Sequence, residues 1–215
     1  MRIITGSARG TKLTTLEGDA TRPTTDKVKE ALFSMIQFDI EGRAVLDLFA
    51  GSGQLGLEAL SRGAARGTFI DESRAAVDVI IDNAKKTHLF DRCRVSVSGA
   101  VPFLKSAAGR ETYDIVFLDP PYASGLLKES LALLPPILAP GASVICECDT
   151  EIVSRRLSVR KDEDATAERV LHEIFGGDAA LMAKYTLRRS TVYGRTRIAL
   201  LSLADADVEN AGEAE

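Results

Sequence analysis

The stretch Asp119-Pro120-Pro121-Tyr122 places a carboxylate, two prolines and an aromatic ring at the end of an apolar run. Two consecutive prolines can neither continue a β ladder nor occupy a helix interior, so the run 113–119 is predicted to be a strand that ends in a rigid corner. The Asp119 carboxylate and the Pro120 carbonyl are two hydrogen-bond acceptors, and Tyr122 supplies a ring for stacking. These groups could hold a planar amine. Open α/β sheets bind ligands at the carboxyl ends of their strands, which favours a functional corner over a simple strand end.

A glycine-rich segment, LDLFAGSGQLG over residues 46–56, is the second candidate site. Gly51, Gly53 and Gly56 fit the pattern G-x-G-x-x-G, and Asp71 follows at the end of the next apolar run. Glycines let the backbone turn sharply with a ligand against it, and the acid can accept hydrogen bonds from both hydroxyls of a ribose. NAD and S-adenosylmethionine share these requirements, so the loop does not separate them.

Asp47 lies four residues before the first glycine of this loop. A carboxylate there can hold loop amides or approach the ammonium group of a ligand. It would repel the pyrophosphate of a dinucleotide, because two negative groups would lie close together. S-adenosylmethionine carries an ammonium and a sulfonium, so Asp47 favours the methyl donor.

The segments that must position these residues alternate between strand-like and helix-like patterns. Nearly continuous apolar runs are typical of buried parallel strands, and between them apolar residues recur on one helical face. This alternation predicts a parallel sheet with helices on both faces. The expected strands are 44–50, 67–71, 94–98, 113–119 and 142–148, and the expected helices are 54–63, 73–87 and 126–136.

Two segments extend this α/β core. Residues 1–15 are predicted to form a small hairpin, followed by a helix that begins near Asp26. Residues 185–203 carry β-branched and aromatic residues around Tyr193-Gly194, which predicts a closing antiparallel pair. The charged stretch 161–170 fits either a loop or a helix. We expect an N-terminal extension over 1–25, one catalytic domain over 26–203 and a disordered acidic tail over 204–215.

The composition, 45% hydrophobic and 27% charged, is typical of a globular protein with a substantial core. Because the chain has no long apolar run and no signal-peptide pattern, we expect a cytoplasmic protein that does not contact a membrane. The three cysteines and two histidines have no metal-ligand spacing, so reduced structural thiols and no metal are predicted.

The net charge of −4 is unevenly distributed. Residues 203–215 hold five acids and no base, so the rest of the chain carries +1. Residues 1–29 contain six Lys or Arg against three acids, and residues 184–197 contain five bases and no acid. A solvated face and a phosphate-contacting surface both fit these basic ends.

Taken together, these motifs resemble the RsmD-type methyltransferases, which methylate a guanine N2 in bacterial small-subunit (16S) ribosomal RNA. The matching stretches are MRIITGSARGTKL, RPTTDKVKEALF, VLDLFAGSGQLGLEALSRGA, FIDES, YDIVFLDPPY, LAPGA and YGRTRI. The Asp-Pro-Pro-Tyr motif alone is shared with adenine-N6, cytosine-N4 and glutamine methyltransferases. The two N-terminal stretches narrow the match to this family.

The resemblance implies a Rossmann-like class I methyltransferase with a seven-stranded, mostly parallel sheet whose last strand is antiparallel. The family usually has an acid for the adenine amine where this chain reads Ser98-Gly99-Ala100, so backbone groups or a water are expected to replace it. The cofactor-binding residues implied for S-adenosylmethionine are Asp47, Phe49, Gly51, Ser52, Gly53, Asp71, Gly99 and Ala100. The catalytic residues implied are Asp119, Pro120, Pro121 and Tyr122, and the RNA-binding residues expected are Arg2, Arg9, Lys12, Arg22 and Thr25.

The expected partner is 16S rRNA, free or in an assembling small ribosomal subunit, bound by a monomer. Three alternatives remain at this point. Another Asp-Pro-Pro-Tyr methyltransferase would act on DNA adenine-N6 or on a different RNA. An NAD-dependent oxidoreductase would use the glycine loop but leave the corner unexplained. A non-catalytic RNA-binding module would need neither site.

Overall fold

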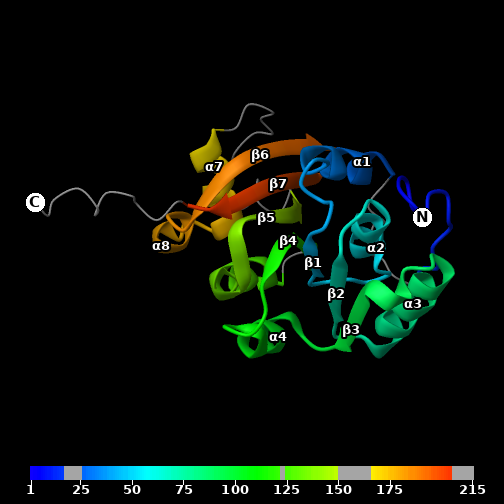
Figure 1. Cartoon of the computed structure of the whole chain (residues 1–215). Coiled ribbons are helices and arrows are strands. Elements are labelled where there is room, and N and C mark those ends of the chain that lie inside the picture. The colour runs from blue at the N-terminus through cyan, green and yellow to red at the C-terminus, as the bar shows by residue number, and fades with distance from the viewer. Residues whose placement is uncertain (17–25, 122–123, 150–165, 205–215) are drawn as a thin grey trace, which may run out of the picture.

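The computed structural model describes residues 1–16, 26–121, 124–149 and 166–204. Their centre is a seven-stranded sheet of order β3-β2-β1-β4-β5-β7-β6 (Figure 1). The five strands β1 to β5 are parallel, and β7 runs antiparallel to both of its neighbours, β5 and β6. This confirms the mostly parallel sheet and the antiparallel last strand expected above. The strands are β1 (Ala44–Asp47), β2 (Arg66–Asp71), β3 (Cys93–Val97), β4 (Tyr113–Leu118), β5 (Leu138–Asp149), β6 (Tyr185–Tyr193) and β7 (Thr196–Leu203).

Helices cover both faces of the sheet because successive strand residues point to opposite sides. On β4, Val116 and Leu118 belong to one buried core, whereas Ile115 and Phe117 belong to the other. The first face carries α4 (Ala100–Ala107), α5 (Leu126–Leu133), α7 (Ala167–Phe175) and α8 (Ala179–Met182). The second face carries α1 (Asp26–Met35), α2 (Gln54–Ser61) and α3 (Arg74–Lys86).

The N-terminal hairpin, here residues 1–16, packs on the second face beside α2 and α3. Arg2 and Lys12 form its antiparallel bridge. The turn of the hairpin contacts the C-terminal end of α2, where the Ser7 N–H donates to the Ser61 carbonyl at 2.8 Å. A Cβ on Gly6 would lie 1.8 Å from that carbonyl oxygen, so only glycine allows so close an approach.

Local sequence explains most element boundaries. The Oγ of Ser73 accepts from the Ala76 N–H and caps α3. The helix expected over 126–136 ends at Leu133 instead, and a 3₁₀ turn, η2 (Pro135–Ile137), follows, because the prolines lack the N–H that a further turn needs. A second 3₁₀ turn, η1 (Phe90–Arg92), precedes β3.

Three features of the fold differ from the sequence expectations or extend them. Helix α4 was not expected, because its short sequence AVPFLKSA shows little periodicity. Helix α7 resolves part of the charged stretch left open above, since Thr166 caps it by accepting from the Arg169 N–H. The predicted tail, residues 205–215, lies outside the described residues, as do 17–25. None of the described helices is long and apolar enough to cross a membrane.

Candidate active site

The candidate site lies where the strand order reverses. The chain builds β2 and β3 on one side of β1 and then crosses to β4 on the other side. Ligands of open α/β sheets bind outside the carboxyl ends of the strands at such a switch point. Asp47 ends β1, Asp71 ends β2, and Asp119 directly follows β4. The topology therefore brings three predicted site residues to one edge.

The glycines of the loop have different structural reasons. Gly51 and Gly53 have φ of +52° and +76°, which favour glycine. An added Cβ on Gly51 would meet nothing within 4 Å, so open space lies against the loop there. A Cβ on Gly56 would lie 2.3 Å from the ring of Phe69, so this glycine lets α2 pack closely on β2.

Asp47 is 3% exposed, and its Oδ2 accepts from the Gly56 N–H at 2.9 Å. Burial raises the pKa of its carboxyl to about 7, and the charges of Asp119 and Asp71 raise it further against the effect of that hydrogen bond. The amides at the start of α2 are where a dinucleotide would place its pyrophosphate. Because a carboxylate already occupies one of them, the geometry argues against NAD.

Asp71 fixes the loop from the neighbouring strand. Its Oδ2 accepts from the Gly51 N–H at 2.8 Å and its Oδ1 from the Ser73 N–H at 2.9 Å. An ionised carboxylate has about four lone-pair directions, so each oxygen keeps capacity for one more donor. A diol could still bind there while the loop stays in place.

The corner after β4 keeps two acceptors free. Within the described residues, nothing donates to the Asp119 carboxylate or to the Pro120 carbonyl. The Pro121 carbonyl, by contrast, accepts from the Ser124 hydroxyl at 2.7 Å. Burial raises the pKa of Asp119, although its side chain keeps partial access to solvent, and only the direction of this shift is used below. Tyr122 lies outside the described residues.

The charge at this edge is negative and lacks a matching cation. In the part of the chain that the structure describes, neither Asp47, Asp71 nor Asp119 pairs with a lysine or arginine. The buried side-chain oxygen of Gln54, the first residue of α2, also has no described hydrogen-bond partner. The described His, Cys, Asp and Glu residues form no cluster that could hold a metal ion. The site therefore suits an organic cation that brings hydrogen-bond donors.

The remaining predicted cofactor residues border the same edge. Gly99 and Ala100 begin α4, and no side chain caps that helix, so its first N–H groups are open to a ligand. Phe49 is partly buried against the core of the first face. The Ser52 hydroxyl donates to the Met1 sulfur at 3.3 Å, which joins the loop to the N-terminal hairpin.

The structure separates the predicted RNA-binding residues. Arg2 and Lys12 face each other across the hairpin bridge, and Arg2 also pairs with Asp26 at 3.1 Å on the surface. Arg9 lies in the turn beside the far end of α2, away from the carboxyl edge of the sheet. Arg22 and Thr25 lie outside the described residues.

Two buried polar groups of this region were not predicted. Asn83 of α3 accepts from the Thr14 N–H at 2.8 Å and donates to the carbonyls of Thr14 and Ser52, each at 2.9 Å. It thereby ties the hairpin to the glycine loop. A polar residue on the apolar face of 73–87 was the signal that could have revealed it.

Glu58 of α2 is the second such group, and it is fully buried with Lys29 of α1. It accepts from the N–H groups of Ile4 and Thr5 at 2.7 and 3.0 Å and pairs with Arg62. Lys29 was counted above among the basic residues of the N-terminal surface, and that count was wrong, because the side chain lies in the interior.

A depression of about 410 Å³ lies between α5 and α8, apart from this site. Lys128 and Asp178 form an ion pair of 3.1 Å within it. It is open to solvent and carries both signs of charge, so we assign no function to it.

The sheet order, the glycine loop after β1 and the acids after β2 and β4 define a class I methyltransferase fold. Solved structures share it over nearly the whole chain. The yhhF protein of Escherichia coli is 35% identical with a TM-score of 0.72, covering 94% of this chain and 97% of that one. The hypothetical protein TTHA0928 of Thermus thermophilus is 25% identical with a TM-score of 0.67, covering 93% and 98%.

Sequence comparison narrows this class to one family. The family described as "Conserved hypothetical protein 95" matches residues 1–171. YlbH of Bacillus subtilis (strain 168) is 43% identical over 155 residues, which cover 71% of this chain and 84% of that protein. "Ribosomal RNA small subunit methyltransferase D" of Escherichia coli (strain K12) is 46% identical over 134 residues, covering 62% and 66%. The chain belongs to the RsmD-type methyltransferase family, which confirms the resemblance.

Proposed function

We propose that this protein transfers a methyl group from S-adenosylmethionine to the exocyclic N2 of a guanine in small-subunit ribosomal RNA. The observation that carries the proposal is the edge where Asp47, Asp71 and Asp119 meet without a paired cation beside an open glycine loop. The name of the Escherichia coli relative supports ribosomal RNA as the substrate.

The residues at this edge fit S-adenosylmethionine. When bound, S-adenosylmethionine supplies an electrophilic methyl group on a sulfonium. The buried charge of Asp47 favours the cationic ligand, and the free lone pairs of Asp71 suit the ribose hydroxyls. The open N–H groups at the start of α4, from Gly99 and Ala100, can bind the adenine in place of the missing acid.

The corner is proposed to hold the target amine. The lone pair of an exocyclic amine is delocalised into the base, so it attacks poorly unless it is oriented. The Asp119 carboxylate and the Pro120 carbonyl would accept the two amine hydrogens, and Tyr122 would stack on the base. Catalysis then comes from orientation and from stabilising the positive charge that develops on nitrogen. The proton leaves to Asp119 or to water.

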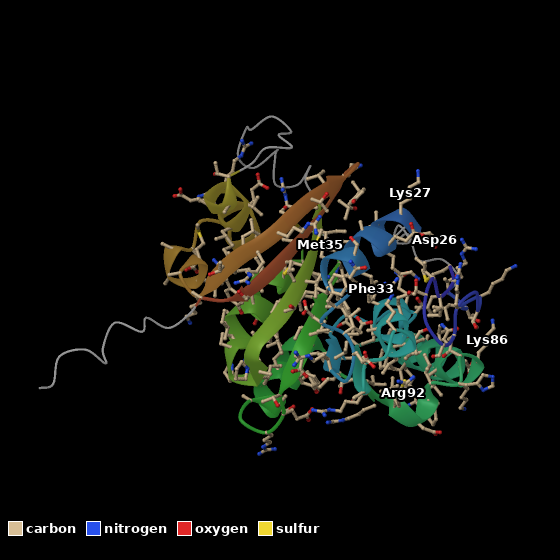
Figure 2. All side chains as sticks on the ribbon, turned by 45° about the horizontal axis from the view of Figure 1, so that its top comes forward. Asp26, Lys27, Phe33, Met35, Lys86 and Arg92 are labelled. Carbon is tan, nitrogen blue, oxygen red and sulfur yellow. The ribbon has the colours of Figure 1, made fainter. Side chains whose placement is uncertain are left out.

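An RNA substrate must present its guanine out of a stack, and unpaired loops do so at low cost. Arg2 and Lys12 on the hairpin would hold nearby phosphates. Lys27 joins them, since Figure 2 shows it beside Asp26 at the outer end of α1, pointing to solvent. Phosphate contacts of this kind weaken steeply with salt, so a flat salt response would argue against the role.

The test is methyl transfer from labelled S-adenosylmethionine to 16S rRNA transcripts and to small ribosomal subunits, with the product nucleoside identified by mass spectrometry. We expect N2-methylguanosine from the wild type and at least a hundredfold loss in Asp119→Ala, with the fold retained by circular dichroism. N6-methyladenosine or a methylated protein would point to the alternative substrates. Calorimetry with S-adenosylmethionine and with NAD separately tests the cofactor.

A further inference from the structure

The β6–β7 hairpin, which has no assigned role above, ends at the same edge of the sheet as the catalytic corner. Thr196 of β7 pairs with Asp149 of β5, and Phe117 of β4 pairs with Ile145. Asp149 lies four residues beyond Ile145, whereas Asp119 lies only two beyond Phe117. The hairpin end therefore projects past the corner by two residues, or roughly 7 Å, and stands about 14 Å to the side across three strand spacings.

Two exposed side chains of β6 point to the face that carries α1 and the N-terminal hairpin. Arg189 pairs with Leu200, and Leu200 packs in the core of that face. Side chains alternate along a strand, so Tyr193, four residues further, lies on the same face. In Figure 1 the carboxyl end of β6 reaches α1, and in Figure 2 the Met35 end of α1 lies toward β6 and β7.

The chemistry of this hairpin end is that of a nucleic-acid contact. Tyr193 is 38% exposed although it is large and aromatic. Arg189 is exposed and forms no ion pair or side-chain hydrogen bond in the described part of the chain. Residues 184–197 contain no acid that could neutralise the arginines locally. An aromatic ring next to free positive charge is the combination that binds single strands, by base stacking and phosphate contact.

The hairpin end is also preorganised. Only Gly194 and Arg195 separate the paired residues Tyr193 and Thr196, and Gly194 has φ of +61°. Two-residue turns with a glycine at positive φ match the twist of their strands and are rigid. The Tyr193 ring is thus held in place before a ligand arrives, which lowers the entropy cost of stacking.

We propose that the end of the β6–β7 hairpin binds the single-stranded RNA that flanks the target nucleotide. Tyr193 stacks on an unpaired base, and Arg189 contacts a phosphate. The RNA then passes from the N-terminal hairpin over the corner to β6, along one face of the sheet. This inference rests on the proposed function, which supplies the RNA substrate.

The experiment combines RNA binding with steady-state methylation. Binding of a 16S rRNA transcript is measured by filter retention over a salt series, and KM and kcat for the same transcript at saturating S-adenosylmethionine. Tyr193→Ser should raise the Kd and KM by about 5- to 150-fold and leave kcat and S-adenosylmethionine affinity unchanged, whereas Tyr193→Phe should stay within about twofold. Arg189→Gln should weaken binding and reduce the slope of log K against log salt by about 0.7.

Lys184→Gln is the matched control for charge. Lys184 is exposed and directly precedes β6, roughly 30 Å along the strand from Tyr193, so its loss should leave binding unchanged. Equal affinity of Tyr193→Ser, Lys184→Gln and wild type would overturn the proposal. A wild type that binds the transcript without methylating it would contradict the proposed function alone, and the binding series would still decide on the hairpin. A wild type that does not bind RNA would overturn both.

Discussion

Replacing Glu58 by glutamine should destabilise the protein strongly, because Glu58 neutralises a cation that cannot reach water. The side chains of Glu58 and Lys29 are both 0% exposed, with Oε2 and Nζ 3.3 Å apart. In Glu58→Gln the Lys29 ammonium would keep the Arg2 carbonyl as an acceptor but lose its counter-charge. Removing one partner of a buried pair costs about 3–5 kcal/mol, and we expect a loss of this size in the free energy of unfolding.

The loss should depend on pH in a defined direction. Burial lowers the pKa of Lys29, and Glu58 is the main group that opposes this. Without Glu58 the folded-state pKa falls further below the unfolded value, so the unfolded state binds more protons between the two. Stability of the variant should therefore rise with pH in that window, and its deficit should shrink from pH 7 to pH 9.

Urea unfolding at both pH values measures this deficit. Asp78→Asn is the matched control, since it removes the charge of an exposed i, i+4 pair with Arg74 and should change stability by less than about 0.5 kcal/mol. Hydrogen exchange of the Ile4 and Thr5 amides, which donate to Glu58, should accelerate in Glu58→Gln only. If Glu58→Gln is no less stable than Asp78→Asn at pH 7, the reasoning is refuted.

Three further predictions concern the cofactor loop. Gly51→Ala should retain the fold by circular dichroism yet lose S-adenosylmethionine binding in calorimetry, because its Cβ enters open space beside the loop; Gly56→Ala should cost about 1–3 kcal/mol in urea unfolding through contact with Phe69, and the reverse pattern would contradict these roles. Asp47 binds a proton in the folded state up to about pH 7, so wild-type stability without ligand should fall as pH rises from about 4 to 7; Asp47→Asn should be the more stable protein at pH 8, gain nothing at pH 5, and bind S-adenosylmethionine at least tenfold more weakly. Asn83→Ala should lower the melting temperature and speed exchange of the Thr14 amide, and an unchanged exchange rate would show that the hairpin is held without it.

Local sequence was sufficient for the parts of the fold that depend on short-range pattern. The apolar run into Asp119, the two prolines after it and the glycines after Asp47 indicated strand ends and a ligand loop. Parallel strands must place their carboxyl ends at one edge, so the meeting of Asp47, Asp71 and Asp119 followed from the order of elements alone.

Only the tertiary structure decided how the charges are used. In the sequence Lys29 looks like a surface base and Glu58 an isolated acid, yet they are buried against each other because α1 packs over α2. The link from Asn83 to Thr14 spans 69 residues, and no local pattern encodes such a distant partner. The position of Tyr193 beside the site edge depends on the pairing register of β5 with β7 and of β7 with β6. Spacing and residue type thus determined which chemistry was available, whereas register and helix packing decided which groups are buried, which are paired and which face the substrate edge.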